Sequence, residues 1–388
     1  MAKRITILGS TGSIGRQALE LLSPLGLEVE GLSCGSQVEL LLEQALQYRP
    51  RLVHLHSEEA ALKFRSRWPR KLGACPEILS GEEGLVRLAA LPVDTILIAI
   101  TGFAAVPALA SAIAAGQRIG LANKEAIVCA GQIFMPEIFA RDITLIPVDS
   151  EHSAIWQALK VGPDRAVSRL YLTASGGPFR GWTAKEIESV TPQDALRHPK
   201  WQMGPKITID SASLMNKALE LIEAVQLFQV PAETIEVIVH PEALIHSMVG
   251  YSDGSIIAQA ALPDMRLPIQ LALTWPDRVP ALTSLPDLTR DFGSIHFEAV
   301  DESVFPALRL AREALKVGDL GPCILNAANE MAVGAFLQGE ISFPAIWRTV
   351  EGALRAYDEL TSGLTGSAIR DIMSCDARTR RHVQDCLL

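Results

Sequence analysis

The first 150 residues alternate short apolar runs with helical patterns, and this alternation constrains the fold more than any other feature of the chain. Apolar runs typical of strands occupy residues 4–8, 28–33, 52–56, 95–100, 119–122 and 143–148, and helical patterns occupy 15–22 and 38–48. The run at 95–100 is almost continuously apolar, as in a strand covered on both faces. We therefore expect an α/β protein whose N-terminal domain, residues 1–150, is a doubly wound parallel sheet of the Rossmann type.

The pattern changes after residue 150. Strands are expected at 169–173, 234–239 and 255–259, which predicts an α+β catalytic domain over 151–276. The stretch 277–297 contains Pro280, Pro286 and Gly293 and is typical of a linker. Helical patterns at 305–315, 324–337 and 343–357 predict a small helical C-terminal domain over 298–388.

Composition excludes several classes of protein. A chain of 388 residues is long enough for roughly two or three domains. The net charge of −9 shows no basic excess, so we expect no nucleic-acid partner. The apolar runs are far shorter than the ~20 residues of a membrane span. The six cysteines have no zinc-type spacing and no signal peptide precedes the first strand, so we expect a cytoplasmic protein without a membrane partner.

A glycine-rich turn, Gly9-Ser10-Thr11-Gly12-Ser13-Ile14-Gly15, lies between the first strand and the first helix. Its glycines permit a tight turn and a close approach of the backbone to a pyrophosphate at the helix N-terminus. A purely structural turn is the alternative, but the strand–turn–helix context favours a dinucleotide site. The second strand then ends in Gly35-Ser36-Gln37 without the acidic residue that binds the ribose of NAD. The sequence therefore favours NADPH, although no arginine stands beside this strand end.

Two polar clusters are candidates for chemistry. Asp149-Ser150-Glu151 follows a strand directly, where carboxylates suit Mg²⁺ or Mn²⁺; helix capping explains the tripeptide equally well. In the helical pattern that follows residue 214, Asn216, Lys217 and Glu220 share one face, which we expect to be solvated and to hold an anionic small molecule. Taken alone, that second cluster is more often a surface ion pair.

Two further segments are typical of anion binding. The strand at 169–173 leads into a Ser175-Gly176-Gly177 turn, which predicts either an anion nest or a plain hairpin. Residues 197–205 combine Arg, His and Lys with Trp201 and end in Gly and Pro. This segment predicts a lid over the ligand, the alternative being a solvated loop.

Together these segments resemble the 1-deoxy-D-xylulose 5-phosphate reductoisomerases. Most of the chain takes part in the resemblance. Its motifs are 9–15, Ala122-Asn123-Lys124-Glu125, 147–152, 174–179, His198-Pro199-x-Trp201-x-Met203-Gly204, 209–220, His240-Pro241, His246-Ser247-Met248-Val249 and 326–330. The resemblance implies rearrangement and reduction of 1-deoxy-D-xylulose 5-phosphate to 2-C-methyl-D-erythritol 4-phosphate, a step of the non-mevalonate isoprenoid pathway. It also implies NADPH, a divalent metal and a homodimer.

The resemblance also implies a role for each matching residue. The metal ligands would be Asp149, Glu151 and Glu220. Substrate contacts would come from Lys124, Ser150, Ser175, His198, Ser211, Asn216 and Lys217, with Trp201 and Met203 on the lid. NADPH would contact Thr11, Gly12, Ser13, Ile14, Asn123, Glu125 and Gly204, with Gly35, Ser36 and Gln37 at the end of the second strand.

The sequence departs from some relatives at two places. Ser36-Gln37 stands where those relatives have Lys-Asn, and Ala243 stands where they have Ser. Two other functions remain open on the residues alone. A simple NADP-dependent dehydrogenase needs no site with three carboxylates, and a regulatory protein that senses NADPH has no use for one.

Overall fold

The computed structural model describes residues 3–69, 71, 73–163, 166–197, 203–280 and 282–387. The chain forms two compact units whose segments alternate along the sequence. The first unit contains Met1–Ala126, Pro136–Ser153 and Asp264–Ser284, and the second contains Ile127–Met135, Ala154–Pro263 and Leu285–Leu388. The three-domain division expected from the sequence stays a prediction.

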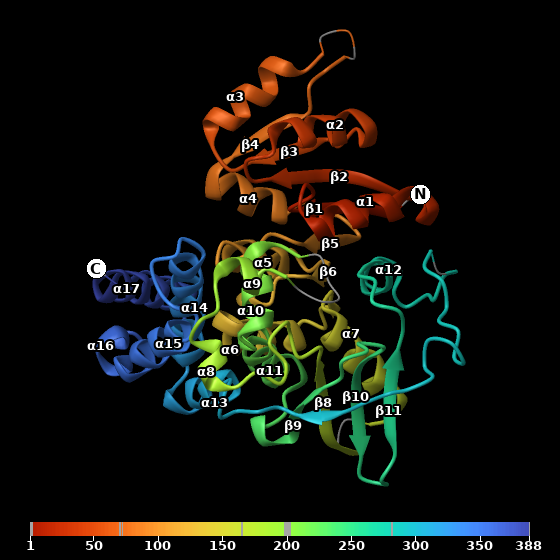
Figure 1. Ribbon diagram of the computed structural model, residues 1–388. Coiled ribbons are helices and arrows are strands. Elements are labelled where there is room, and N and C mark those ends of the chain that lie inside the picture. The colour runs from red at the N-terminus through yellow and green to blue at the C-terminus, as the bar shows by residue number, and fades with distance from the viewer. Residues whose placement is uncertain are drawn as a thin grey trace. The chain divides into compact units, whose positions relative to one another are not determined.

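The first unit is built on a seven-stranded sheet in the order β4-β3-β2-β1-β5-β6-β7 (Figure 1). All its strand pairs are parallel, which confirms the predicted doubly wound sheet. The strands are β1 (Lys3–Leu8), β2 (Leu27–Cys34), β3 (Leu52–Leu55), β4 (Glu77–Ser80), β5 (Thr95–Ile98), β6 (Arg118–Leu121) and β7 (Leu145–Pro147). The sequence did not predict β4, whose Glu-Ile-Leu-Ser is too short for a periodic signal.

Helices connect the strands of this unit. They are α1 (Ser13–Leu25), α2 (Val38–Tyr48), α3 (Glu58–Arg67), α4 (Gly81–Ala89) and α5 (Ala105–Ala115), while α6 (Glu125–Ala140) and α7 (Ser150–Ala158) extend into both units. The unit also contains α12 (Arg266–Thr274), which follows β11 in the chain and connects none of these strands. The strand order reverses between β1 and β5. Ligands of open parallel sheets bind at such a switch point, beyond the carboxyl ends of the strands.

The second unit contains a mixed five-stranded sheet in the order β11-β10-β8-β9-β12 (Figure 1). Its strands are β8 (Val167–Ala174), β9 (Ile235–Val239), β10 (Ile245–Tyr251), β11 (Ile256–Ala260) and β12 (Glu298–Ala299). Strands β8 and β9 are parallel, whereas β10 runs antiparallel to both β8 and β11. The three strands predicted here are confirmed, and β10 and β12 are additions.

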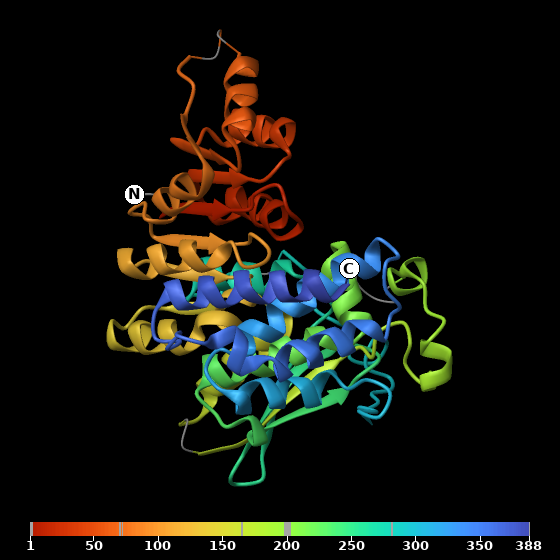
Figure 2. The ribbon, with the colours of Figure 1, turned by 90° about the vertical axis from the view of Figure 1, so that its left-hand side faces the viewer.

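Helices make up the rest of the second unit. Before the C-terminal group lie η2 (Leu159–Val161), α8 (Ala184–Ile187), α9 (Pro192–Ala195), α10 (Pro205–Ala212), α11 (Met215–Phe228) and η4 (Ala232–Thr234). The C-terminal group is α13 (Ala307–Val317), α14 (Gly321–Leu337), α15 (Ala345–Arg355), α16 (Tyr357–Thr361) and α17 (Ile369–Leu387), and Figure 2 shows its members side by side. Phe343 packs edge-on against three other rings, Phe179, Phe336 and Trp347. No helix in the described part of the chain is long and apolar enough to cross a membrane.

Candidate active site

The glycine turn after β1 lies at the switch point of the first unit's sheet. A Cβ atom on Gly9 would lie 2.6 Å from the carbonyl oxygen of Ala99, and one on Gly15 would lie 2.3 Å from the oxygen of Gly9. Both positions therefore require glycine. Gly12 is the N-cap of α1 and has no side chain to satisfy the first N–H groups of the helix. Those groups suit an anion such as a pyrophosphate. Of the other predicted residues, Thr11 is buried, Ile14 is half-buried and Ser13 is exposed.

Two polar residues that the sequence analysis did not single out, Gln44 and Ser33, hold this turn. The Ser10 hydroxyl donates to Oε1 of Gln44 at 2.7 Å, and the Gln44 amide donates back to the Ser10 carbonyl at 2.9 Å. The hydroxyl of Ser33 accepts the N–H of Gly9 at 2.9 Å. Gln44 is a buried polar residue on a largely apolar helix, α2. Its position in that apolar pattern was the one feature of the sequence that could have indicated a buried hydrogen-bonding role.

The end of β2 lies next to the glycine turn because β1 and β2 are parallel neighbours. Cys34 is buried, and the next three residues, Gly35, Ser36 and Gln37, are exposed. This edge thus presents a hydroxyl and an amide and no carboxylate, which leaves room for a 2′-phosphate without charge repulsion.

Asn123 joins the end of β5 to the start of α6. Its amide nitrogen donates to the carbonyls of Ile100 and Gly102, each at 3.0 Å, and its oxygen accepts the N–H of Ala126 at 2.8 Å. The side chain thereby fixes the loop that carries Lys124 and Glu125, both of which are buried.

Asp149 is the centre of a polar cluster at the carboxyl end of β7. Its Oδ2 lies 3.1 Å from Nζ of Lys124, while its Oδ1 accepts the N–H groups of Glu151 and His152 at 3.1 and 3.2 Å. The Ser150 hydroxyl donates to the carboxylate of Glu151. Asp149 therefore caps the start of α7, as expected if the tripeptide only ends a loop and begins a helix. It also lies beside the ammonium group of Lys124.

The second polar cluster lies on α11, in the second unit. Glu220 accepts hydrogen bonds from the ammonium of Lys217 and from the amide of Asn216, the latter at 2.5 Å. The expectation that this face is solvated is wrong, because the side chains of Lys217 and Glu220 are only 6% and 1% exposed. Helix α11 packs against α13, α14, β8 and β9, and mutual pairing lets the charged groups remain in that interior.

Two hydroxyl-bearing segments of the second unit meet at the Ser-Gly-Gly turn. Gly176 and Gly177 have φ of 85° and 66°, which favour glycine, and the N–H of Gly177 points at the Ser175 hydroxyl at 3.4 Å. A Cβ atom on Gly177 would lie 3.0 Å from the carbonyl oxygen of Ser211. The turn thus packs on the end of α10 and brings the segments of Ser175 and Ser211 together.

The predicted lid is described only at its ends. His198 and Trp201 lie outside the described residues. Met203 is half-buried, and Gly204 is exposed and forms the N-cap of α10. In α10, the ammonium of Lys206 lies 2.8 Å from the carboxylate of buried Asp210, one turn further along the helix.

The three predicted metal ligands offer suitable donor chemistry. Asp149 and Glu151, in the first unit, and Glu220, in the second, are all carboxylates. Carboxylate oxygens are the ligands that Mg²⁺ and Mn²⁺ prefer. The residues present therefore fit a hard divalent cation.

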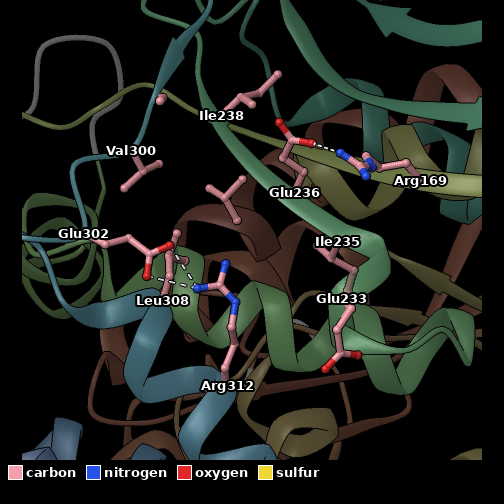
Figure 3. A pocket seen from close by; sticks show the side chains of 11 residues that line it. Arg169, Glu233, Ile235, Glu236, Ile238, Val300, Glu302, Leu308 and Arg312 are labelled. Atoms are coloured by element: carbon pink, nitrogen blue, oxygen red, sulfur yellow. Dashed lines mark hydrogen bonds and ion pairs between the residues drawn. The ribbon is translucent and has the colours of Figure 1, made fainter.

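A separate pocket of about 340 Å³ lies on the second unit beside β9 and α13 (Figure 3). Figure 3 shows two ion pairs in it, Glu302 with Arg312 at 2.9 Å and Arg169 with Glu236 at 2.5 Å. None of the predicted site residues lines this pocket. Both arginines are already paired, so the pocket offers no free cation to a sugar phosphate.

Models of one enzyme family match most of the length of the chain. The 1-deoxy-D-xylulose 5-phosphate reductoisomerase model matches residues 5–131, and two models of the C-terminal domains of that enzyme match 145–228 and 261–382. The reductoisomerase of Heliobacterium modesticaldum is 49% identical over 362 residues, 92% of each chain. That of Chloroherpeton thalassium is 45% identical over 386 residues, 99% of this chain and 98% of its own.

The chain is also similar to solved structures of reductoisomerases. The Zymomonas mobilis reductoisomerase in complex with NADPH has a TM-score of 0.91 and 38% identity, and the match covers 100% of this chain and 99% of that one. A reductoisomerase in complex with NADPH, fosmidomycin and magnesium has a TM-score of 0.93 and 35% identity, with 99% and 98% covered.

Proposed function

The chain belongs to the 1-deoxy-D-xylulose 5-phosphate reductoisomerase family, and we propose the residues that carry out the family's reaction in it. The protein is an NADP-dependent oxidoreductase. With NADPH and a divalent metal it rearranges and reduces 1-deoxy-D-xylulose 5-phosphate to 2-C-methyl-D-erythritol 4-phosphate, a step of the non-mevalonate isoprenoid pathway. The observation that carries this conclusion is the 49% identity over 92% of both chains.

NADPH is proposed to lie across the glycine turn of the first unit. The pyrophosphate would accept the N–H groups at the start of α1, contributed by residues 12–14, with Thr11 beside them. The ribose phosphate would lie against the edge formed by Gly35, Ser36 and Gln37. Asn123, Glu125 and Gly204 complete the proposed contacts. The support is the steric requirement for glycine at 9 and 15 and the lack of an acidic residue after β2.

The metal is proposed to be held by Asp149, Glu151 and Glu220. A divalent cation supplies Lewis-acid polarisation of the oxygens of the hydroxyketone when it is bound. Lys124 beside Asp149 and Lys217 beside Glu220 compensate the negative charge that the carboxylates bring to the site. Together with Ser150 and Asn216, these ammonium groups would orient the hydroxyls of the sugar chain.

The phosphate of the substrate is proposed to bind at the Ser-Gly-Gly turn. Ser175 and Ser211 come from adjacent segments and supply hydroxyl donors, and Asn216 supplies an amide. His198, with Trp201 and Met203, would close over the phosphate from the lid. A dry, closed site would retain the aldehyde intermediate until it is reduced.

We further propose that the protein acts as a cytoplasmic homodimer, in line with the family resemblance. Light scattering of the purified protein during size-exclusion chromatography would measure the mass of the assembly. A mass equal to that of one 41.9 kDa chain would contradict the dimer.

The activity is tested by incubating the purified protein with 1-deoxy-D-xylulose 5-phosphate, NADPH and Mg²⁺ or Mn²⁺ and following the absorbance of the nicotinamide. Oxidation of NADPH should require both the sugar phosphate and the metal, and a chelator should stop it. Oxidation that proceeds without metal would favour a simple dehydrogenase. NADPH binding without any turnover would favour a sensor.

A further inference from the structure

Two buried cysteines face each other across the packed helices α14 and α17 of the second unit. The sulfur of Cys323, on α14, lies 3.6 Å from the carbonyl oxygen of Ile372, on α17. The sulfur of Cys375, on α17, lies 4.0 Å from the carbonyl oxygen of Leu320, just before α14. Each thiol thus contacts the carbonyl oxygen of the residue three positions before the other cysteine. This reciprocal arrangement places each sulfur atom beside the segment that carries the other cysteine.

A third thiol completes the cluster. The pKa of Cys323 is affected by two neighbouring thiols, that of Cys375 and that of Cys129, which lies on α6 in the same unit. Hydrogen bonding to these two thiols, together with burial, raises the pKa of Cys323. The same contact has the opposite effect on its partner, because the hydrogen bond with Cys323 lowers the pKa of Cys375.

The cluster has no part in the reductoisomerase site proposed above. All three side chains are 0% exposed, and they come from three different helices. Cys34 makes a useful contrast, because it is also buried but its sulfur contacts the carbonyl oxygen of its neighbour Gly35 at 3.7 Å. Burial raises the pKa of Cys34 to about 12 even though a backbone hydrogen bond at Gln37 acts in the opposite direction, and no second thiol contributes to this shift.

We propose that Cys323 and Cys375 are a site of oxidative modification, at which hydrogen peroxide converts the two thiols into a disulfide between α14 and α17. The sulfur of Cys375 is the nucleophile that peroxide meets, because the pKa of this thiol is lowered whereas that of Cys323 is raised. The buried pair becomes reachable when α17, the C-terminal helix, opens locally.

The chemistry of this step balances. The Cys375 thiolate attacks peroxide, so that an S–O bond forms, the O–O bond breaks and the hydroxide released takes up the thiol proton as water. The sulfur of Cys323 then attacks the sulfenic acid, so that the S–S bond forms, the S–O bond breaks and a second water leaves with the remaining proton. Two thiols are oxidised and one peroxide is reduced to two waters.

The disulfide would tie the last helix of the chain to α14. The link closes a loop over residues 324–374, which includes α15 and α16. Closing a loop of this length restricts the unfolded chain strongly, so α17 should open less often in the oxidised protein. Hydrogen exchange in α17 should therefore slow after oxidation and recover after reduction.

The test is non-reducing peptide mapping of the full-length protein before and after treatment with hydrogen peroxide. We expect a cross-linked peptide pair containing Cys323 and Cys375, with a loss of about 2 Da relative to the two thiol peptides and full reversal by dithiothreitol. Cys34→Ser is the matched control for a buried thiol outside the cluster and should leave the cross-link unchanged. Cys375→Ser should abolish it.

The peptide map of the wild-type protein tests the proposed disulfide even if a cysteine variant folds poorly. A cross-link between Cys323 and Cys129 in place of Cys375 would overturn the assignment of the pair. Sulfinic or sulfonic acids at these positions without any cross-link would overturn the disulfide itself, as would two thiols that stay reduced while the protein is otherwise oxidised.

Discussion

The ammonium group of Lys217 and the carboxylate of Glu220 are hydrogen-bonded one turn apart on α11, and both side chains are buried. An exposed pair of this kind contributes at most about 1 kcal/mol to stability. Burying the pair carries a desolvation cost that its attraction often fails to recover, so the pair is poor evidence for a stabilising role. A function in binding a polar ligand explains better why these charges lie inside the second unit.

Replacement of Gly15 by alanine should disable the cofactor site. The new Cβ atom would lie 2.3 Å from the carbonyl oxygen of Gly9, so the turn would have to open. We expect the Kd for NADPH to rise by at least about tenfold, equivalent to about 1.4 kcal/mol, in a fluorescence titration. Gly352→Ala on α15 is the control, because no atom lies within 4 Å of the added Cβ and NADPH affinity should not change.

Cofactor choice should depend on the uncharged edge after β2. Ser36→Asp would place a carboxylate where the 2′-phosphate is proposed to lie, and this charge should repel NADPH while offering the ribose hydroxyl of NADH an acceptor. We expect kcat/KM for NADPH relative to NADH to fall by about tenfold or more. Ser36→Ala adds no charge and should keep the preference for NADPH. A wild-type protein that uses both cofactors equally well would contradict the account.

The stability of the protein should decline in acid because of His246. Burial lowers the pKa of this imidazole from 6.5 to about 4, assisted by the nearby charges of His240 and Lys217 and opposed by backbone hydrogen bonds at Ala261 and Leu262. Between these two pH values the unfolded chain takes up a proton that the folded chain does not, so stability is full above 6.5 and falls toward 4. The loss from this group should reach about 3 kcal/mol. Urea unfolding of wild-type and His246→Asn proteins across this range checks the slope, which the variant should lack.

Much of the fold could be predicted because the parallel sheet is buried on both faces. The helix at 38–48 and the strands of the first unit show strong periodicity or continuous apolar runs, and these signals do not depend on distant partners. In contrast, α17 is rich in charged residues, and its buried face of Ile372, Cys375, Thr379 and Val383 offers a weak apolar signal. Only the packing of α17 on α14 and α15 reveals that face.

The polar residues on α11 could be singled out from the sequence, whereas their surroundings could not. Lys217 and Glu220 are polar and three residues apart, which predicts a shared face and implies that it faces solvent. Their burial depends on α13, α14 and the strands that pack on α11, all distant in the sequence. The roles of Gln44 and Ser33 in holding the glycine turn likewise depend on contacts that no local pattern encodes.

Glu220→Gln is the sharpest test of the proposed metal site. The substitution removes one proposed anionic ligand and the carboxylate that pairs with Lys217. Breaking a buried ion pair costs about 3–5 kcal/mol, so a loss of stability alone would not separate a metal ligand from a structural residue. Glu223→Gln is the matched control, since Glu223 is equally buried on the same helix and has no proposed role in metal binding.

The most direct measurement is the Kd for Mn²⁺ by electron paramagnetic resonance, taken for wild-type, Glu220→Gln and Glu223→Gln proteins with NADPH affinity as a check on folding. The account predicts that Glu220→Gln weakens Mn²⁺ binding at least about tenfold and lowers kcat about 100-fold, because a misplaced substrate loses that much rate. NADPH affinity should remain, and Glu223→Gln should bind Mn²⁺ as the wild type does. Normal Mn²⁺ affinity and turnover in folded Glu220→Gln protein would contradict the claim that Glu220 is a metal ligand.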